Sequence, residues 1–192
     1  MEGIRSFIAI EVPQPLQARM GEIQQELKTL ETDIKWVRPG SIHLTLKFLG
    51  AVPKETLEKF SLAVSPVILR EEPFDLRLQG VGCFPSIKNP RVLWVGIDRG
   101  CEKVSFLQEA IEKETAGLSL PSERRPFKPH LTIGRVRSLK SKGLLARAVA
   151  NKQETEIGVF QARETVLFQS ELTPAGAIYT KIRIFPMKAS PI

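Results

Sequence analysis

Alternating apolar and polar positions in the first half of the chain predict strands separated by amphipathic helices. Ile4 to Glu11 is typical of a strand, and Pro13-Gln14-Pro15 then opens a helical pattern that reaches about Leu30. A second alternating run covers Ile42 to Leu49. After Pro53, apolar residues recur at helical spacing, which predicts a second helix.

The second half of the chain continues this mixture. Phe74 to Leu78 and Arg91 to Ile97 predict two strands separated by a loop, and a helix follows from Gly100 to about Gly117. A proline-rich loop, Leu118 to Pro129, leads to a strand at Leu131 to Val136. The remaining predicted elements are a helix from about Lys140 to Ala150 and two strands, Gly158 to Gln169 and Ala177 to Phe185.

This order of elements favours an α+β fold with mainly antiparallel pairing, because short turns join several strands directly. The 192 residues, 42% of them hydrophobic, suffice for one large domain or two small ones. The longest apolar stretches are far shorter than the roughly 20 residues that cross a bilayer, and the N-terminus lacks the pattern of a signal peptide. We therefore expect a cytoplasmic protein with no membrane span.

The charge balance is basic, with 28 Lys and Arg against 21 Asp and Glu, and the isoelectric point is near 9.6. This balance is compatible with a polyanionic partner such as RNA but does not require one. Cys83 and Cys101 lack the spacing of a zinc site or a disulfide framework. They are predicted to be reduced thiols.

One internal repeat carries both histidines of the chain. Ser41 to Leu46 is matched by Lys128 to Ile133, and His43 and His130 each begin the sequence His-Leu-Thr-aliphatic. Because the chain has two histidines in total, coincidence explains the repeat poorly. The repeat indicates two similar lobes that each contribute one such strand.

Strand geometry gives the repeat a chemical meaning. Side chains alternate between the two faces of a strand, so each histidine shares a face with the threonine two residues later, and the aliphatic residues face the other way. If the two strands face each other across a cleft, two imidazoles and two hydroxyls converge. One imidazole can then act as base and the other as acid in a displacement at phosphorus, while the hydroxyls hydrogen-bond the phosphate oxygens.

Two less specific interpretations remain. A histidine in a strand is often a hydrogen-bonded structural residue, although the paired motif favours catalysis. A zinc site would need further ligands, and no carboxylate or cysteine lies at ligand spacing.

The paired motifs resemble those of the two-histidine (2H) phosphoesterases, and most closely the bacterial and archaeal RNA 2′,3′-cyclic phosphodiesterases, also called 2′-5′ RNA ligases. The resemblance covers nearly the whole chain. Its flanking segments are Arg5 to Ile10, Trp36 to Pro39, Pro90 to Gly96, Arg125 to Val136 and Gly176 to Tyr179.

The resemblance implies a single bilobal domain over residues 1–192, with two pseudosymmetric lobes of mainly antiparallel sheet, helices outside and a central cleft. It implies hydrolysis of RNA 2′,3′-cyclic phosphate ends to a 2′-phosphate, with possible reversible 2′-5′ ligation, and neither metal nor cofactor. The expected partner is RNA, including tRNA fragments. Length and the lack of a coiled-coil pattern favour a monomer.

Carried over to this chain, the resemblance makes His43 and His130 the acid and base pair and Thr45 and Thr132 the phosphate contacts. The sequence does not decide which histidine is the acid.

Two further residues have weaker assignments. Arg135 would approach the phosphate, or be a solvated cation at a strand end. Phe7 would stack a nucleobase, or be a core residue. A basic rim for longer RNA would comprise Lys47, Arg124, Arg125, Lys128 and Arg137.

Other substrates and functions fit the same motifs. A small cyclic nucleotide or an ADP-ribose cyclic phosphate would suit the same chemistry. A non-catalytic RNA-binding module is the alternative from a different class, although a pure binder has no need for two imidazoles.

Overall fold

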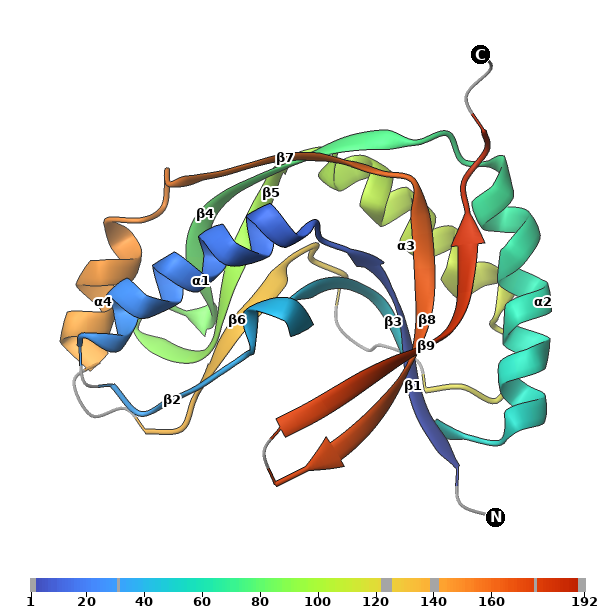
Figure 1. The fold of residues 1–192 in the computed structure, drawn as a ribbon, viewed down its shortest axis with the longest axis horizontal. Helices are drawn as coiled ribbons and strands as arrows, with labels where there is room; N and C mark the ends of the chain where they lie inside the picture. The colour runs from blue at the N-terminus through green and yellow to red at the C-terminus, as the bar shows by residue number, and fades with distance from the viewer. Residues whose placement is uncertain (1–2, 31, 122–125, 139–141, 175, 190–192) are drawn as a thin grey trace.

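A computed structural model describes residues 3–30, 32–121, 126–138, 142–174 and 176–189. In this part of the chain, four α-helices accompany one mainly antiparallel sheet (Figure 1). The strands are β1 (Ile4–Glu11), β2 (Ile34–Trp36), β3 (His43–Val52), β4 (Phe74–Ser86), β5 (Asn89–Arg99), β6 (Leu131–Val136), β7 (Glu156–Ala162), β8 (Glu164–Thr173) and β9 (Gly176–Pro186). The helices are α1 (Gln14–Lys28), α2 (Lys54–Arg70), α3 (Cys101–Glu114) and α4 (Lys142–Ala150), and a short 3₁₀ turn, η1 (Pro39–Ser41), precedes β3.

The sheet has two matching halves. Its strand order is β7-β4-β5-β6-β3-β1-β8-β9, and β2 adds to β6. Each half therefore starts at the centre with a strand of the sequence repeat, β6 or β3, and continues outward through three more strands. This confirms the predicted α+β fold with two lobes of antiparallel sheet.

The helices cover one face of the sheet. Leu44 of β3 and Leu131 of β6 are buried in the same core as Ile23 of α1, Phe60 of α2 and Leu107 of α3. In Figure 1, α1 and α4 lie beside the lobe of β4 and β6, and α2 and α3 lie toward β9. Burial of these apolar faces is the main stabilising contribution to the fold.

The lobes are interleaved along the chain. The β1–β3 pair is joined through α1 and β2, which contact the lobe of β6, and the hairpin β8–β9 returns to β1 from that lobe. Each lobe is thus completed by segments far apart in sequence.

The single strand predicted over Gly158 to Gln169 is wrong. β7 ends at Ala162 and pairs with β4, and β8 begins at Glu164 and pairs with β1, at the opposite end of the sheet. Figure 1 shows the chain turning sharply between them. No glycine or proline marks the break, so hydrophobic periodicity alone merges the two strands.

The loop predicted between Leu78 and Arg91 is also mostly strand. β4 and β5 form a long hairpin in which Pro85 is paired with Pro90 near its end. Gly80 has φ +79° at an irregularity of this ladder, where a left-handed backbone conformation favours glycine. The glycines and prolines that suggest a loop therefore lie at a bulge and near the hairpin turn.

The state of the cysteines and the absence of a membrane-spanning helix are also predicted from the sequence. Cys83 is buried and Cys101 is half-buried, and both are free thiols. In the described part of the chain, no helix is both long and apolar enough to span a membrane.

Candidate active site

The two repeated motifs meet at the centre of the sheet. Leu44 of β3 pairs with Leu131 of β6 in antiparallel register, and both leucines are buried toward the helices. The histidine and threonine on either side of each leucine therefore point to the uncovered face. The register extends to place His43 beside Thr132 and Thr45 beside His130. The two imidazoles and two hydroxyls that are predicted to converge thus lie on the same face of two adjacent strands.

Both imidazoles are held in the same tautomer. Nδ1 of His43 donates a hydrogen bond to the carbonyl of Ser41 over 2.8 Å, and Nδ1 of His130 donates to the carbonyl of Lys128 over 2.6 Å. A carbonyl oxygen can only accept, so Nδ1 carries the proton in each ring. Nε2 is then the atom of each ring that is available to exchange a proton with substrate.

The environment of His43 favours the neutral ring. Burial lowers the pKa of His43 to about 4, although the Ser41 carbonyl and the charge of Glu11 act in the opposite direction. The ring is packed between the face of Phe7 and the edge of Tyr179, whose centroids lie 4.5 Å and 5.2 Å from it. These rings exclude water from His43 and so disfavour its charged form.

His130 has a more open environment. Burial again lowers its pKa, the Lys128 carbonyl opposes the shift, and the positive charge of Arg135 adds to the lowering. Its ring meets the edge of Phe84 at a centroid distance of 4.9 Å and an interplanar angle of 90°. Each histidine is therefore supported by aromatic rings from other strands of its own lobe.

A β-bulge brings Arg135 to the same face as His130. Arg135 lies five positions after His130, an odd offset that would place the two side chains on opposite faces of a regular strand. The register between β5 and β6 slips where Trp94 pairs with Thr132 and Leu93 with Gly134, so Ile133 is the extra residue. Gly134 then faces Trp36, because a Cβ there would lie 3.1 Å from the indole ring. Arg135 is exposed on the uncovered face.

β3 has the same irregularity at the same distance from its histidine. Thr45 pairs with Ala9 and Lys47 with Ile8, which leaves Leu46 as the extra residue. Lys47 therefore points into the core, where it is ion-paired with Glu112, and Phe48 occupies the place that corresponds to Arg135. Lys47 is thus not part of an exposed basic rim.

The other predicted rim residues have different outcomes. Lys128 and Arg137 are exposed, with the ammonium of Lys128 lying 5.9 Å from the centre of the Phe84 ring. Arg124 and Arg125 lie outside the described residues.

Phe7 lies beneath His43. It is 3% exposed and packs with Ala9, Val166 and Phe168 in a small cluster separate from the main core. One face of its ring is stacked on the imidazole. Among the two interpretations of Phe7, this burial favours the core residue over a nucleobase platform.

Three site residues escape sequence reasoning alone. Phe84 lies in the stretch predicted as a loop, and Tyr179 comes from the last strand, whose pairing the sequence does not specify. Trp94 pairs with Thr132 and lies across Gly82, where a Cβ would be 2.3 Å from the indole ring. The alternating pattern around Trp94 predicts a strand, and a glycine opposite a large ring is a common pairing. Only the strand register shows that Gly82 is the residue opposite Trp94.

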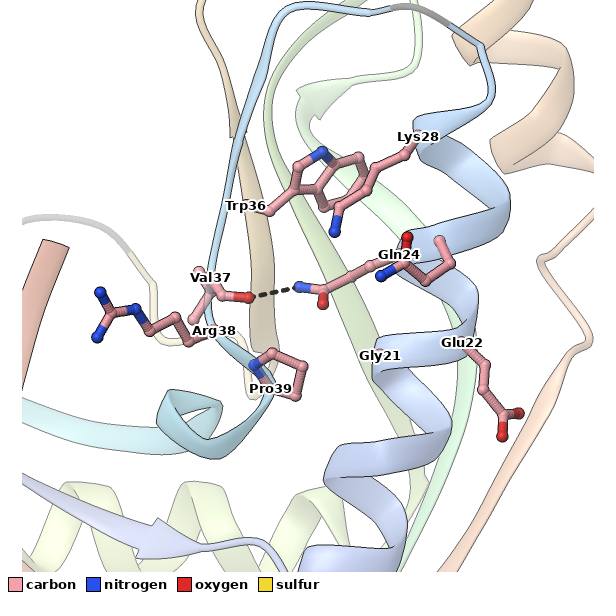
Figure 2. Close-up of a pocket in the computed structure, with 9 residues that line it drawn as sticks. Gly21, Glu22, Gln24, Lys28, Trp36, Val37, Arg38 and Pro39 are labelled. Carbon is pink, nitrogen blue, oxygen red and sulfur yellow. Dashed lines mark hydrogen bonds between the residues drawn. The ribbon is translucent and has the colours of Figure 1, made fainter. Parts of the chain in front are cut away.

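Gln24 of α1 holds β6 in position from behind. Its side-chain amide donates to the carbonyl of Val37 over 2.7 Å and to that of Ile133, the bulged residue, over 2.8 Å. Figure 2 shows Gln24 reaching across to Val37 at a pocket of about 420 Å³ between α1 and the segment of Trp36 and Pro39. None of the predicted catalytic residues lines this pocket.

No three His, Cys, Asp or Glu side chains in the described ranges form a group that could hold a metal ion.

A pair of His-x-Thr strands at the centre of a two-lobed antiparallel sheet is the arrangement of the two-histidine phosphoesterases. The chain belongs to the LigT-like phosphoesterase family, whose model matches residues 10–94 and again residues 95–179. Each matched segment contains one of the repeated motifs. The two copies of the internal repeat therefore lie in two successive matches to the same family model.

Known proteins resemble the chain over nearly its full length. The RNA 2′,3′-cyclic phosphodiesterase of Methanothermobacter thermautotrophicus is 35% identical over 182 residues, which are 95% of this chain and 98% of the relative. The protein of the same name from Archaeoglobus fulgidus is 34% identical over 184 residues, 95% of this chain and 99% of the relative. The crystal structure of a Thermus thermophilus protein has a TM-score of 0.80 at 28% identity and covers 95% of this chain and 97% of its own.

Proposed function

We propose that this protein hydrolyses the 2′,3′-cyclic phosphate end of RNA to a 2′-phosphate, with His43 and His130 as its acid and base. The carrying observation is the pairing of Leu44 with Leu131, which turns both histidines and both threonines to one face. The relatives named RNA 2′,3′-cyclic phosphodiesterase support the substrate class, because they match the chain from end to end.

The chemistry requires two coordinated proton transfers. Water attacks phosphorus in line with the 3′ oxygen, a new P–O bond forms and the P–O3′ bond breaks. Nε2 of one imidazole accepts the proton of the water, and Nε2–H of the other donates a proton to the departing 3′ oxygen. Both rings present Nε2 for this purpose, since Nδ1 is occupied by a backbone carbonyl in each.

The developing charge falls on the two non-bridging phosphate oxygens. Thr45 and Thr132 flank the imidazoles and can donate hydrogen bonds to these oxygens. Arg135 adds a positive charge on the same face, close enough to His130 to act on its pKa. With acid, base and charge stabilisation all supplied by side chains, the proposed reaction is independent of metal.

The test is the incubation of the purified protein in EDTA with an RNA oligonucleotide that ends in a 2′,3′-cyclic phosphate. A 2′-phosphate product is expected, and His43→Gln and His130→Gln should each lower the rate by at least about a hundredfold. Glu109→Gln, at an exposed position of α3, is the matched control and should retain activity. Full activity in either histidine variant would refute the mechanism, and a 3′-phosphate product would refute the direction of ring opening.

The proposal extends to the oligomeric state, the RNA substrate and the cellular location. We expect a monomer that acts on RNA fragments, including those of tRNA, in the cytoplasm. The net charge of +7 supports a polyanionic substrate. Light scattering on a size-exclusion column tests the monomer, and competition between tRNA fragments and unrelated RNA ends tests the substrate.

A further inference from the structure

Two arginines on the uncovered face have no acidic partner in the described part of the chain. Arg5 of β1 and Arg135 of β6 are both exposed, and neither is ion-paired with a described carboxylate. By contrast, Lys181 of β9, two residues after Tyr179, is paired with Glu11. The two guanidinium groups are therefore free to meet an anion.

Tyr179 lies near both arginines. Burial raises the pKa of its phenol, and the positive charges of Arg135 and Arg5 both act in the opposite direction, so both lie near the hydroxyl. The edge of its ring meets Phe7 at 5.0 Å and His43 at 5.2 Å. Tyr179 thus links the catalytic imidazole to the two unpaired cations.

Strand register places Arg5 in the same row as Tyr179. Ser6 pairs with Gln169, so Arg5 lies one step further along, beside Ser170, and Ser170 pairs with Tyr179. Arg5 shares its face with Phe7, two residues later in β1. In Figure 1, the β8–β9 hairpin projects from beside β1 toward the side that carries β2 and β6.

The position of Arg5 along β1 separates it from the histidine pair. Glu11 is the residue of β1 that pairs with His43, and Arg5 lies six positions before it. Phe7, two residues after Arg5 on the same face, is nevertheless stacked on His43, so the surface within reach of the Arg5 guanidinium borders the imidazole. Arg135 follows His130 by five residues and is the closer of the two cations to the reacting phosphate. Arg5 is better placed for a second phosphate.

We propose that Arg5 and Tyr179 form a subsite for the phosphodiester that precedes the terminal nucleotide of RNA, so that the protein prefers an oligonucleotide end to a cyclic mononucleotide. This inference rests on the proposed function. The guanidinium binds two phosphate oxygens as a fork, and the phenol donates a third hydrogen bond. Contacts of this kind position the RNA without reading its sequence.

The test compares two substrates that share a terminal nucleotide: 2′,3′-cyclic AMP, and a short RNA that ends in the same cyclic nucleotide. The ratio of their kcat/KM values should favour the RNA in the unchanged protein. Arg5→Gln should lower this ratio by about tenfold, and Arg5→Lys should recover part of it. Tyr179→Phe, which keeps the ring against His43 and removes only the hydroxyl, should lower the ratio several-fold.

Arg183→Gln is the matched control. Arg183 is an exposed arginine of β9, but it pairs with Leu167, which belongs to the core on the helix side. Its replacement should leave the ratio as it is. An unchanged ratio in Arg5→Gln, or an equal loss with both substrates, would overturn the subsite.

Binding separates this inference from the proposed function. The dissociation constants of adenosine 2′-phosphate and of a short RNA ending in the same 2′-phosphate are measured in parallel. If the protein turns over neither cyclic substrate, the proposed function fails. The subsite is then supported if Arg5→Gln weakens binding of the RNA more than binding of the mononucleotide, and refuted if both bindings change equally.

Discussion

Phe7 is stacked face to face on His43, with ring centroids 4.5 Å apart and planes inclined by 22°. One face of the imidazole is therefore closed to water by a side chain that is itself 3% exposed. Because a charged ring loses more hydration than a neutral ring, this packing favours neutral His43. If His43 takes part in catalysis as proposed, Phe7 acts on the reaction through it as a positioning residue.

Phe7→Ala should raise the pKa of His43 from about 4 toward the ordinary value of 6.5, because water then reaches the ring. His43 would become protonated at pH 5 to 6, where it is neutral in the unchanged protein. We expect the acid limb of the kcat/KM profile to move to higher pH. Phe106→Ala, on the exposed side of α3, is the control. An acid limb that stays in place would contradict the role of Phe7.

The two histidines should titrate separately. Because the chain has two histidines, its NMR spectrum contains two imidazole signals, and His43→Gln assigns them. The signal of His43 should titrate near pH 4, and that of His130 below its ordinary value of 6.5, because burial and the charge of Arg135 lower its pKa. Because His130 has the more open environment, we expect the shared proton of the free protein to lie on His130, as required if His43 accepts the proton of the water. The optimum of kcat/KM is expected below pH 6.5, and a reversed order of titration would refute this distribution.

Arg135→Gln should lower kcat/KM by about tenfold to a hundredfold, since it removes a cation near the phosphate. It should also raise the pKa of His130, because the charge of Arg135 lowers that pKa. Arg135→Lys retains the charge and should preserve the pKa while it loses the forked hydrogen bond. Activity and the NMR titration of His130 are measured together. A solvated strand-end cation would change neither.

Gln24→Leu should lower the free energy of unfolding by about 1–3 kcal/mol, because it removes the side-chain amide that donates to the carbonyls of Val37 and Ile133; the Ile133 carbonyl keeps only the bond from the Val37 N–H. Since Ile133 is the bulged residue of β6, activity at a temperature below unfolding should fall as well. Gln25→Leu, at the exposed neighbouring position, is the matched control for urea unfolding. Equal stability of the two variants would show that these hydrogen bonds contribute little.

The ion pair of Lys47 and Glu112 should respond unequally to the loss of either partner. The side chain of Lys47 is 5% exposed and that of Glu112 is 30% exposed. Glu112→Gln leaves a buried ammonium without its counterion and should cost about 2–3 kcal/mol of unfolding free energy. Lys47→Met leaves a carboxylate that water can reach, and should cost less than about 1 kcal/mol. Equal losses of unfolding free energy in the two variants would indicate that the difference in burial between Lys47 and Glu112 does not set the cost of removing a partner.

Much of the fold follows from local patterns in the sequence. The boundaries predicted for β1 and β6 are confirmed, and so are the helices that follow Pro13, Pro53 and Gly100. These elements have either strict alternation or helical spacing over many residues, together with clear starting and ending residues. The boundary between β7 and β8 has no such marker, and β4 and β5 contain glycines and prolines that lie within the strands, at a bulge and near the hairpin turn.

The sequence alone determined the candidate chemistry, because His43 and His130 stand in identical four-residue motifs on predicted strands. It also determined which side chains share a face as far as each threonine, since alternation needs no knowledge of the partner strand. Beyond that point the two bulges reverse the alternation, turning Lys47 inward and Arg135 outward.

Only the tertiary structure decided what surrounds the two histidines. The aromatic residues that contact the histidines are far from them in sequence and come from strands that only the folded sheet brings close. They are Phe7, Phe84 and Tyr179. Burial and charge, which set the pKa of each imidazole, depend on these long-range contacts. A pattern along one chain specifies which face a residue takes, but the residues that meet there are fixed by how the strands pair.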